Sequence, residues 1–183
     1  MKRVHVLDGR AIARILERMA AEILERAGEE RRLYLVGIQT RGVPLAHRLA
    51  AIIAGGSDQA PPVGALDISL YRDDVGPWRP AHQQPVLHAT RLTENVDGRI
   101  VCLVDDVLYT GRTVRAALDT LMDFGRPQAI RLAVLIDRGH RELPIAADFV
   151  GRTIPTGGQE DVQVRLKESD GEEGVWVARE EDV

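Results

Sequence analysis

The fold class of this chain is indicated most clearly by residues 100–113, which read Ile100-Val101-Cys102-Leu103-Val104-Asp105-Asp106-Val107-Leu108-Tyr109-Thr110-Gly111-Arg112-Thr113. Its first five residues form an apolar run that is typical of a strand buried on both faces of a parallel sheet. Two carboxylates and a Thr-Gly-Arg-Thr turn follow this strand, and then a helix is predicted over residues 113–124, ended by Gly125. A strand that leads through a polar turn into a helix predicts the α/β class.

Strands and helices alternate along the rest of the chain. Asp8 is favoured as the N-cap of a first helix, which Gly28 ends. Strands are predicted over residues 33–38, 63–70, 86–89 and 129–136, and another helix over residues 44–54. We therefore expect a single domain, residues 1–183, with a central, mostly parallel sheet flanked by helices. Short apolar runs after Ile136 predict a smaller appended subregion.

Composition excludes several classes of protein. The 183 residues carry a formal net charge of -4, which argues against a uniformly basic nucleic-acid binder. The single cysteine, Cys102, cannot form an intrachain disulfide or a cysteine zinc site, and we expect it to be a buried thiol. No apolar stretch approaches the length of a membrane span, and the first residues do not resemble a signal peptide. We therefore expect a cytoplasmic protein without membrane contacts.

The turn after the Asp105–Asp106 pair predicts a site for a ribose 5-phosphate. Backbone N–H groups at a helix N-terminus bind phosphate, Gly111 allows close approach, and threonine hydroxyls can donate to phosphate oxygens. Adjacent carboxylates accept hydrogen bonds from ribose hydroxyls or hold a divalent cation. The chain lacks Gly-Lys-Ser/Thr and Gly-x-Gly-x-x-Gly, which excludes a Walker loop and a dinucleotide fingerprint. The alternative is that Asp106 and Thr113 are only helix caps.

The segment resembles the phosphoribosyl-pyrophosphate signature of type I phosphoribosyltransferases. The whole chain is similar to a narrower family, the pyrimidine operon attenuation regulators that are also uracil phosphoribosyltransferases. Three further motifs carry this resemblance: VGIQTRG at 36–42, DISLYRDD at 67–74 and DRGHRELPI at 137–145. It implies the type I phosphoribosyltransferase fold with a small hood over the base, roughly residues 137–183 plus parts of the N-terminus. It further implies production of UMP and pyrophosphate from uracil and phosphoribosyl pyrophosphate, Mg²⁺ carried by that substrate, and a homodimer or higher homo-oligomer. It also implies UMP- or UTP-dependent binding of a leader mRNA stem-loop.

The resemblance assigns roles to individual residues. Asp105 and Asp106 would hold the ribose hydroxyls, and either could act as a base. Arg72 would be catalytic, on a flexible loop at roughly residues 71–85, although it could instead pair with Asp73 and Asp74. The remaining residues expected to bind phosphoribosyl pyrophosphate or UMP are Thr40, Arg41, Gly42, Val107, Leu108, Tyr109, Thr110, Gly111, Arg112 and Thr113. Arg138 and Val162 would bind the base, and no residue is assigned to a dedicated metal site.

The RNA-binding role is implied for six basic residues: Arg14, Arg18, Arg26, His140, Arg141 and Arg152. The alternative is a solvated helix face with ordinary Arg18–Glu22 and Glu22–Arg26 ion pairs. The chain carries Glu17, Ala21 and Ala146 where relatives tend to carry threonine, histidine and a basic residue. These differences leave open a salvage phosphoribosyltransferase without RNA regulation. A third interpretation is a non-catalytic nucleotide sensor, against which the presence of Asp105, Asp106, Thr40, Arg41 and Arg72 argues.

Overall fold

Two sheets and four helices make up residues 2–28, 32–55, 59–69 and 89–179, which a computed structural model of the protein describes. The larger sheet has five parallel strands in the order β3-β2-β4-β5-β6, and the smaller has three antiparallel strands in the order β1-β8-β7. The elements in chain order are β1 (Lys2–Asp8), α1 (Gly9–Ala27), β2 (Leu33–Ile38), α2 (Gly42–Ala54), β3 (Val63–Leu66), β4 (Ile100–Leu108), α3 (Arg112–Met122), β5 (Ala129–Asp137), β6 (Phe149–Thr153), β7 (Glu160–Arg165), α4 (Lys167–Asp170) and β8 (Gly174–Arg179).

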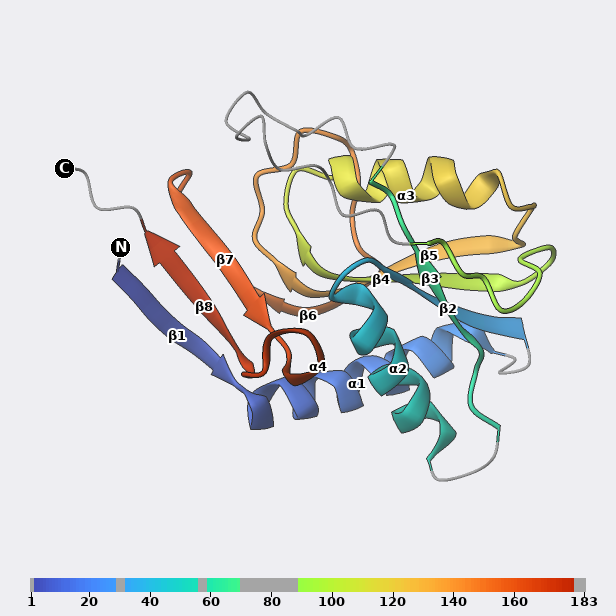
Figure 1. Cartoon of the computed structure of the whole chain (residues 1–183), viewed down its shortest axis with the longest axis horizontal. Helices are drawn as coiled ribbons and strands as arrows, with labels where there is room; N and C mark the ends of the chain where they lie inside the picture. Colours follow the sequence, from blue (N-terminus) through green and yellow to red (C-terminus); the bar gives the residue numbers. More distant parts are fainter. Residues whose placement is uncertain (1, 29–31, 56–58, 70–88, 180–183) are drawn as a thin grey trace.

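Helices cover both faces of the parallel sheet, with α1 and α2 on one side and α3 on the other (Figure 1). The central strand β4 divides its side chains between these layers: Cys102 and Val104 join the core under α1 and α2, and Val101 and Leu103 join the core under α3. A strand buried on both faces needs apolar residues at consecutive positions, which is the pattern of this segment. The predicted α/β class, with its parallel sheet between helices, is confirmed.

Several predicted boundaries shift in the structure. Strand β4 continues to Leu108, because it keeps pairing with β5 after the paired stretch of β2 has ended. Strand β3 stops at Leu66, where the Asp67 carboxylate accepts the Ser69 N–H at 2.9 Å and turns the chain. Of the predicted strand at 86–89, residues 86–88 lie outside the described part and Ala89 is in no strand.

The predicted helix boundaries also need correction. Helix α1 has its expected bounds, with Asp8 accepting the Ala11 N–H at 2.7 Å. Helix α2 begins at Gly42, two residues before Pro44, because proline is tolerated anywhere in the first helical turn. Helix α3 ends at Met122, and the next residues close with tighter turns, the Phe124 N–H donating to the Leu121 carbonyl oxygen.

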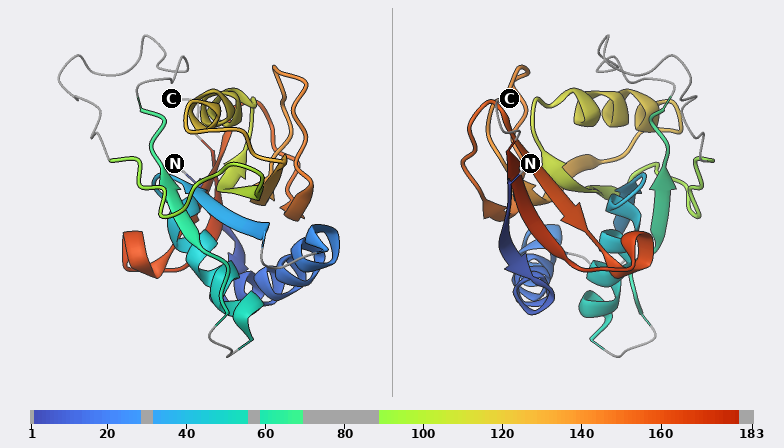
Figure 2. Two further views of the ribbon diagram at one scale, coloured as in Figure 1. Left: turned by 90° about the vertical axis from the view of Figure 1, so that its right-hand side faces the viewer. Right: turned by 60° about the vertical axis from the view of Figure 1, so that its left-hand side comes forward.

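The smaller sheet, called here the hood sheet, consists of β1, β7 and β8 and joins the two ends of the described chain (Figure 2). The sequence did not predict β1, a strand of seven residues that pairs along β8 near the other end of the described chain. Val162, Val164 and Val175 of the hood sheet pack into the core that contains α1. Within the described ranges, no helix combines the length and apolar character that crossing a bilayer requires.

Candidate active site

The loop after β2 lies directly against β4 at the carboxyl edge of the parallel sheet. A Cβ on Gly42 would stand 2.2 Å from the Val104 carbonyl oxygen, so only glycine allows this approach. The loop also contains Thr40 and Arg41, and its Gln39–Thr40 peptide bond is cis. The predicted pyrophosphate residues and the predicted ribose carboxylates therefore come from neighbouring strands and meet at one edge.

Asp105 and Asp106 lie in the part of β4 that continues beyond Val104, where the strand was predicted to end. Asp105 is 6% exposed and accepts the Asp106 N–H at 2.9 Å, and Asp106 accepts the Val107 N–H at 2.9 Å. Burial raises the pKa of the Asp106 carboxyl, while the positive charge of Arg41 and a hydrogen bond with Asp105 oppose this rise. The pair therefore places carboxylate oxygens beside an arginine in a partly desolvated site, which suits hydroxyl or cation binding.

The turn at residues 109–113 is built to present backbone N–H groups. Gly111, at the N-cap of α3, has a φ of 94°, a left-handed conformation that favours glycine. The Arg112 side chain pairs with Glu142, with Nε and Oε2 2.7 Å apart. Arg112 therefore contributes its backbone, and not this side-chain group, to the predicted phosphate site. The Thr110 carbonyl oxygen accepts the N–H groups of Glu142 and Leu143 at 3.0 and 3.1 Å, which fixes the turn from outside.

One cavity of about 270 Å³ joins the predicted phosphate and base residues. It is lined by Asp106, Val107, Leu108, Tyr109, Thr110, Gly111, Thr113, Val114, Arg138, Asp161 and Val162. The predicted residues from the end of β4 and the start of α3 line this cavity together with Arg138 and Val162, whereas five others are not among its lining residues: Thr40, Arg41, Gly42, Asp105 and Arg112. Arg72 and the flexible loop predicted at 71–85 lie outside the described residues.

Arg138 is a buried residue that lines this cavity. Its side chain is 6% exposed, and its guanidinium carbon lies 4.1 Å from the centre of the Tyr109 ring. Nε donates to Thr156 Oγ1 at 3.2 Å, and Nη2 donates to the Glu160 carbonyl oxygen. Arg138 thus ties the end of β5 to the segment that leads into Val162.

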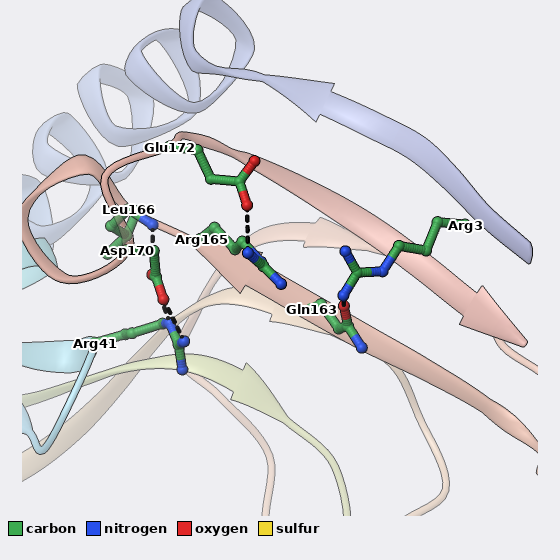
Figure 3. Close-up of polar contacts among 7 residues, drawn as sticks. All are labelled: Arg3, Arg41, Gln163, Arg165, Leu166, Asp170 and Glu172. Atoms are coloured by element: carbon green, nitrogen blue, oxygen red, sulfur yellow. Dashed lines mark hydrogen bonds and ion pairs between the residues drawn. The ribbon is translucent and has the colours of Figure 1, made fainter. Parts of the chain in front are cut away.

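The structure also reveals a contact that the sequence did not indicate. The Arg41 guanidinium forms two hydrogen bonds with Asp170 of α4, Nε to Oδ2 at 3.0 Å and Nη2 to Oδ1 at 2.7 Å (Figure 3). These residues are 129 positions apart, so no local pattern could have shown their pairing. Among the residues that the structure describes, no group of three His, Cys, Asp or Glu side chains is arranged to hold a metal ion.

The RNA-binding candidates on α1 are partly occupied by contacts within the chain. Arg18 donates to the carbonyl oxygens of Val150 and Gly151 and pairs with Glu22 at 2.6 Å, as the sequence indicated. Arg26 pairs with Asp148 at 3.4 Å instead of Glu22. These two arginines therefore fasten α1 to the β6 segment.

The remaining RNA-binding candidates divide into two kinds. His140 contacts the Thr156 carbonyl oxygen at 2.6 Å, and Arg141 pairs with Asp137 at 2.5 Å, so both hold the loop after β5. Arg14 and Arg152 have exposed side chains on α1 and β6, whose residues pack together. Three other exposed positions lack a basic side chain, as the sequence indicated: Glu17, Ala21 and Ala146.

Known proteins similar to this chain agree on one family. Residues 4–167 match the family described as the phosphoribosyl transferase domain. The chain is 58% identical to the bifunctional protein PyrR of Pelotomaculum thermopropionicum, an alignment that covers 96% of each chain. It is 56% identical to the bifunctional protein PyrR of a Roseiflexus species, covering 95% of this chain and 94% of the relative.

Solved structures share the fold at much lower identity. A hypoxanthine phosphoribosyltransferase of Staphylococcus aureus superposes with a TM-score of 0.69 at 18% identity, covering 97% of this chain and 92% of that chain. The hypoxanthine phosphoribosyltransferase of Trypanosoma cruzi has a TM-score of 0.71 at 17% identity and covers 97% of each chain. The fold is therefore one that purine enzymes also use.

Proposed function

Because the chain belongs to the phosphoribosyl transferase family and, within it, to the bifunctional PyrR proteins, we propose that it has two linked activities. It is a uracil phosphoribosyltransferase, and it is a UMP- or UTP-dependent RNA-binding regulator of transcription attenuation in a pyrimidine operon. The observation that carries the enzymatic activity is the single cavity that joins Asp106, the Thr110–Thr113 turn and Val162. This cavity has the parts that a nucleoside monophosphate needs: carboxylates, a helix N-terminus and a base pocket.

Each end of the substrate has its own set of residues in this proposal. The 5-phosphate binds backbone N–H groups of residues 110–113 and the hydroxyls of Thr110 and Thr113. Val107, Leu108 and Tyr109 form one wall of the cavity. Thr40, Arg41 and Gly42 bind pyrophosphate, for which a guanidinium supplies planar and permanent positive charge. Arg138 and Val162 form the base site. Arg72 is proposed as a further catalytic residue on the sequence resemblance alone.

Mg²⁺ fits this site as an ion carried by phosphoribosyl pyrophosphate. Mg²⁺ prefers one or two carboxylates together with substrate phosphates and its own water molecules, and Asp105 and Asp106 are adjacent carboxylates beside Arg41. When bound, the ion neutralises negative charge that develops on the pyrophosphate leaving group. The chain then needs no dedicated metal site.

The residues of the chain act mainly by positioning and electrostatics. The bond between the anomeric carbon and the pyrophosphate oxygen breaks, and a bond forms between that carbon and the uracil ring nitrogen on the opposite face. The anomeric carbon passes through a cationic state, which the carboxylates of Asp105 and Asp106 stabilise while they hold the ribose hydroxyls. The uracil proton leaves to one of these carboxylates or to solvent, and pyrophosphate departs along Arg41.

The regulatory activity needs a basic face that reaches RNA phosphates and splayed bases. Arg14 and Arg152 are exposed candidates for contact with RNA, while Arg18, Arg26, His140 and Arg141 also form contacts within the protein and offer RNA only their remaining donors. One such face is small for a stem-loop, so the proposed binding unit is a homodimer or higher homo-oligomer. A protein that binds messenger RNA and uses these substrates is proposed to act in the cytoplasm.

A second candidate function is uracil salvage without RNA regulation. The observation that favours it is the exposure of Glu17, Ala21 and Ala146, which removes donors and positive charge from the candidate RNA face. Because phosphate contacts dominate affinity for nucleic acids, each such loss weakens binding.

A base-panel assay tests the enzymatic proposal. Purified protein is incubated with Mg²⁺, phosphoribosyl pyrophosphate and uracil, cytosine, hypoxanthine or guanine, and nucleotide and pyrophosphate are measured together. We expect nucleotide to form only when the base is uracil, with UMP and pyrophosphate produced in equal amounts. Turnover of a purine base in preference to uracil would refute the substrate assignment, and no pyrophosphate with any base would refute the enzymatic activity.

A further inference from the structure

The connection between β7 and β8, residues 166–173, is fastened to α2 by two arginines, and it is called here the hood turn. Arg48 of α2 donates to both carboxylate oxygens of Glu168 at 2.8 and 2.6 Å and also pairs with Glu173. Arg41, seven residues earlier at the N-cap of α2, lies on the same face of that helix and pairs with Asp170. The hood turn therefore docks beside the pyrophosphate loop through three ion pairs.

Asp170 is itself held in place by the backbone of this turn. Its Oδ2 accepts the Leu166 N–H at 2.9 Å, and its own N–H donates to the Leu166 carbonyl oxygen at 2.7 Å. The Asp170 side chain is 14% exposed, against 37% for Arg41. The carboxylate is therefore the fixed partner of the pair, and the arginine is the partner whose orientation is being set.

The geometry of the pair leaves part of Arg41 available to a ligand. A guanidinium has five N–H donors in a rigid fork, and Asp170 engages the edge formed by Nε and Nη2. Figure 3 shows the remaining guanidinium nitrogen pointing away from Asp170. Arg41 also lies in the loop that packs against β4 at Gly42, next to the strand that carries the proposed ribose residue Asp106, and its positive charge opposes the rise in the pKa of the Asp106 carboxyl.

We propose that Asp170 is a positioning residue, which fixes the Arg41 guanidinium so that its opposite edge binds the pyrophosphate group of phosphoribosyl pyrophosphate. This inference rests on the proposed function. An unpaired arginine would have to be immobilised by the ligand itself, at a cost in conformational entropy. The paired arginine is already oriented, and bidentate pairing is the interaction for which arginine geometry is suited. Asp170 thus links the hood sheet to the substrate without touching the substrate.

Binding measurements on a small set of variants test this role. Dissociation constants for phosphoribosyl pyrophosphate with Mg²⁺ and for UMP are measured by calorimetry on wild type, Asp170→Ala, Asp170→Asn, Arg41→Ala and the double variant with alanine at both positions. Glu172→Ala is the matched control, because Glu172 lies on the same turn but pairs with Arg165. UMP carries the base, ribose and 5-phosphate without pyrophosphate, so its affinity reports the integrity of the rest of the site.

The expected result is a selective loss. Asp170→Ala weakens binding of phosphoribosyl pyrophosphate about tenfold, as expected for an arginine that the ligand must immobilise, and leaves UMP affinity unchanged. Asp170→Asn, which keeps one acceptor oxygen, falls between wild type and Asp170→Ala. The double variant binds no more weakly than Arg41→Ala, since Asp170 acts only through Arg41. Glu172→Ala binds both ligands as wild type does.

Three results would overturn the role of Asp170 alone: equal weakening of both ligands, additive losses in the double variant, or tighter binding of phosphoribosyl pyrophosphate by Asp170→Ala. The last would mean that the carboxylate competes with pyrophosphate for Arg41. A wild type that binds neither ligand would instead refute the proposed function, and the inference with it.

Discussion

Replacement of Arg138 with methionine tests how the base pocket is held together. Methionine keeps an apolar stem beside the Tyr109 ring but loses the hydrogen bonds to Thr156 Oγ1 and the Glu160 carbonyl oxygen. Two hydrogen bonds from a charged donor, at about 1.5 kcal/mol each, set the expected loss of unfolding free energy near 3 kcal/mol. The contact with Asp161, at 3.6 Å and with a largely exposed partner, adds little. Such a loss leaves a typical domain folded.

The same replacement has a kinetic consequence. Release of residues 156–161 misplaces Val162, and a loss of about 1.4 kcal/mol there raises the KM for uracil tenfold. The KM for phosphoribosyl pyrophosphate stays near its wild-type value, because the phosphate turn does not depend on Arg138. Urea unfolding gives the free energy, and initial rates at varied uracil give the KM. The control is Arg131→Met, which removes a half-exposed arginine of β5. Wild-type stability together with a wild-type KM for uracil would refute the reasoning.

Three other predictions follow from the site and the core. Asp105→Asn and Asp106→Asn are expected to lower turnover by orders of magnitude with the circular dichroism spectrum unchanged, and near-normal turnover in both variants would contradict the site assignment. Gly42→Ala is expected to destabilise the protein by about 1–3 kcal/mol, because its Cβ meets a β4 carbonyl oxygen at 2.2 Å, whereas Gly158→Ala, with open space around it, is neutral in the same urea titration. Burial raises the pKa of Cys102 to about 12, so iodoacetamide at pH 8 is expected to label it only after unfolding in urea, and labelling of the native protein would disprove its burial.

Local sequence signals were sufficient for much of the fold. The apolar run before Asp105 and the Asp8 and Gly28 signals at the ends of α1 depend on residues close together in the chain, and the structure has these elements where they were predicted. The end of β4 was not predictable in this way, because the strand continues through two aspartates only while β5 is beside it. The hood strand β1 likewise depends on pairing with β8, at the far end of the chain.

The same distinction between local and long-range contacts applies to the candidate site. Thr110, Gly111 and Thr113 follow β4 within four residues of one another, so the sequence alone was sufficient to predict that they form one turn. The Arg41–Asp170 pair and the Arg138–Thr156 hydrogen bond join separate segments, and no spacing indicates them. Side-chain engagement was equally hidden. Helical spacing places Arg18 on the same exposed face of α1 as Arg14. Its guanidinium nevertheless donates hydrogen bonds to backbone carbonyl oxygens of β6.

Binding of the leader RNA of the protein's own pyrimidine operon, measured with and without UMP at two salt concentrations, is the strictest test of the two linked activities. A basic face that recognises phosphates binds less tightly as salt rises, and a regulator that senses pyrimidine nucleotide binds more tightly with UMP. For a regulator that is also a uracil phosphoribosyltransferase, we expect specific, salt-sensitive binding that UMP strengthens, despite Glu17, Ala21 and Ala146. Binding no tighter than to an unrelated RNA of equal length, with or without UMP, would contradict it and leave uracil salvage as the function.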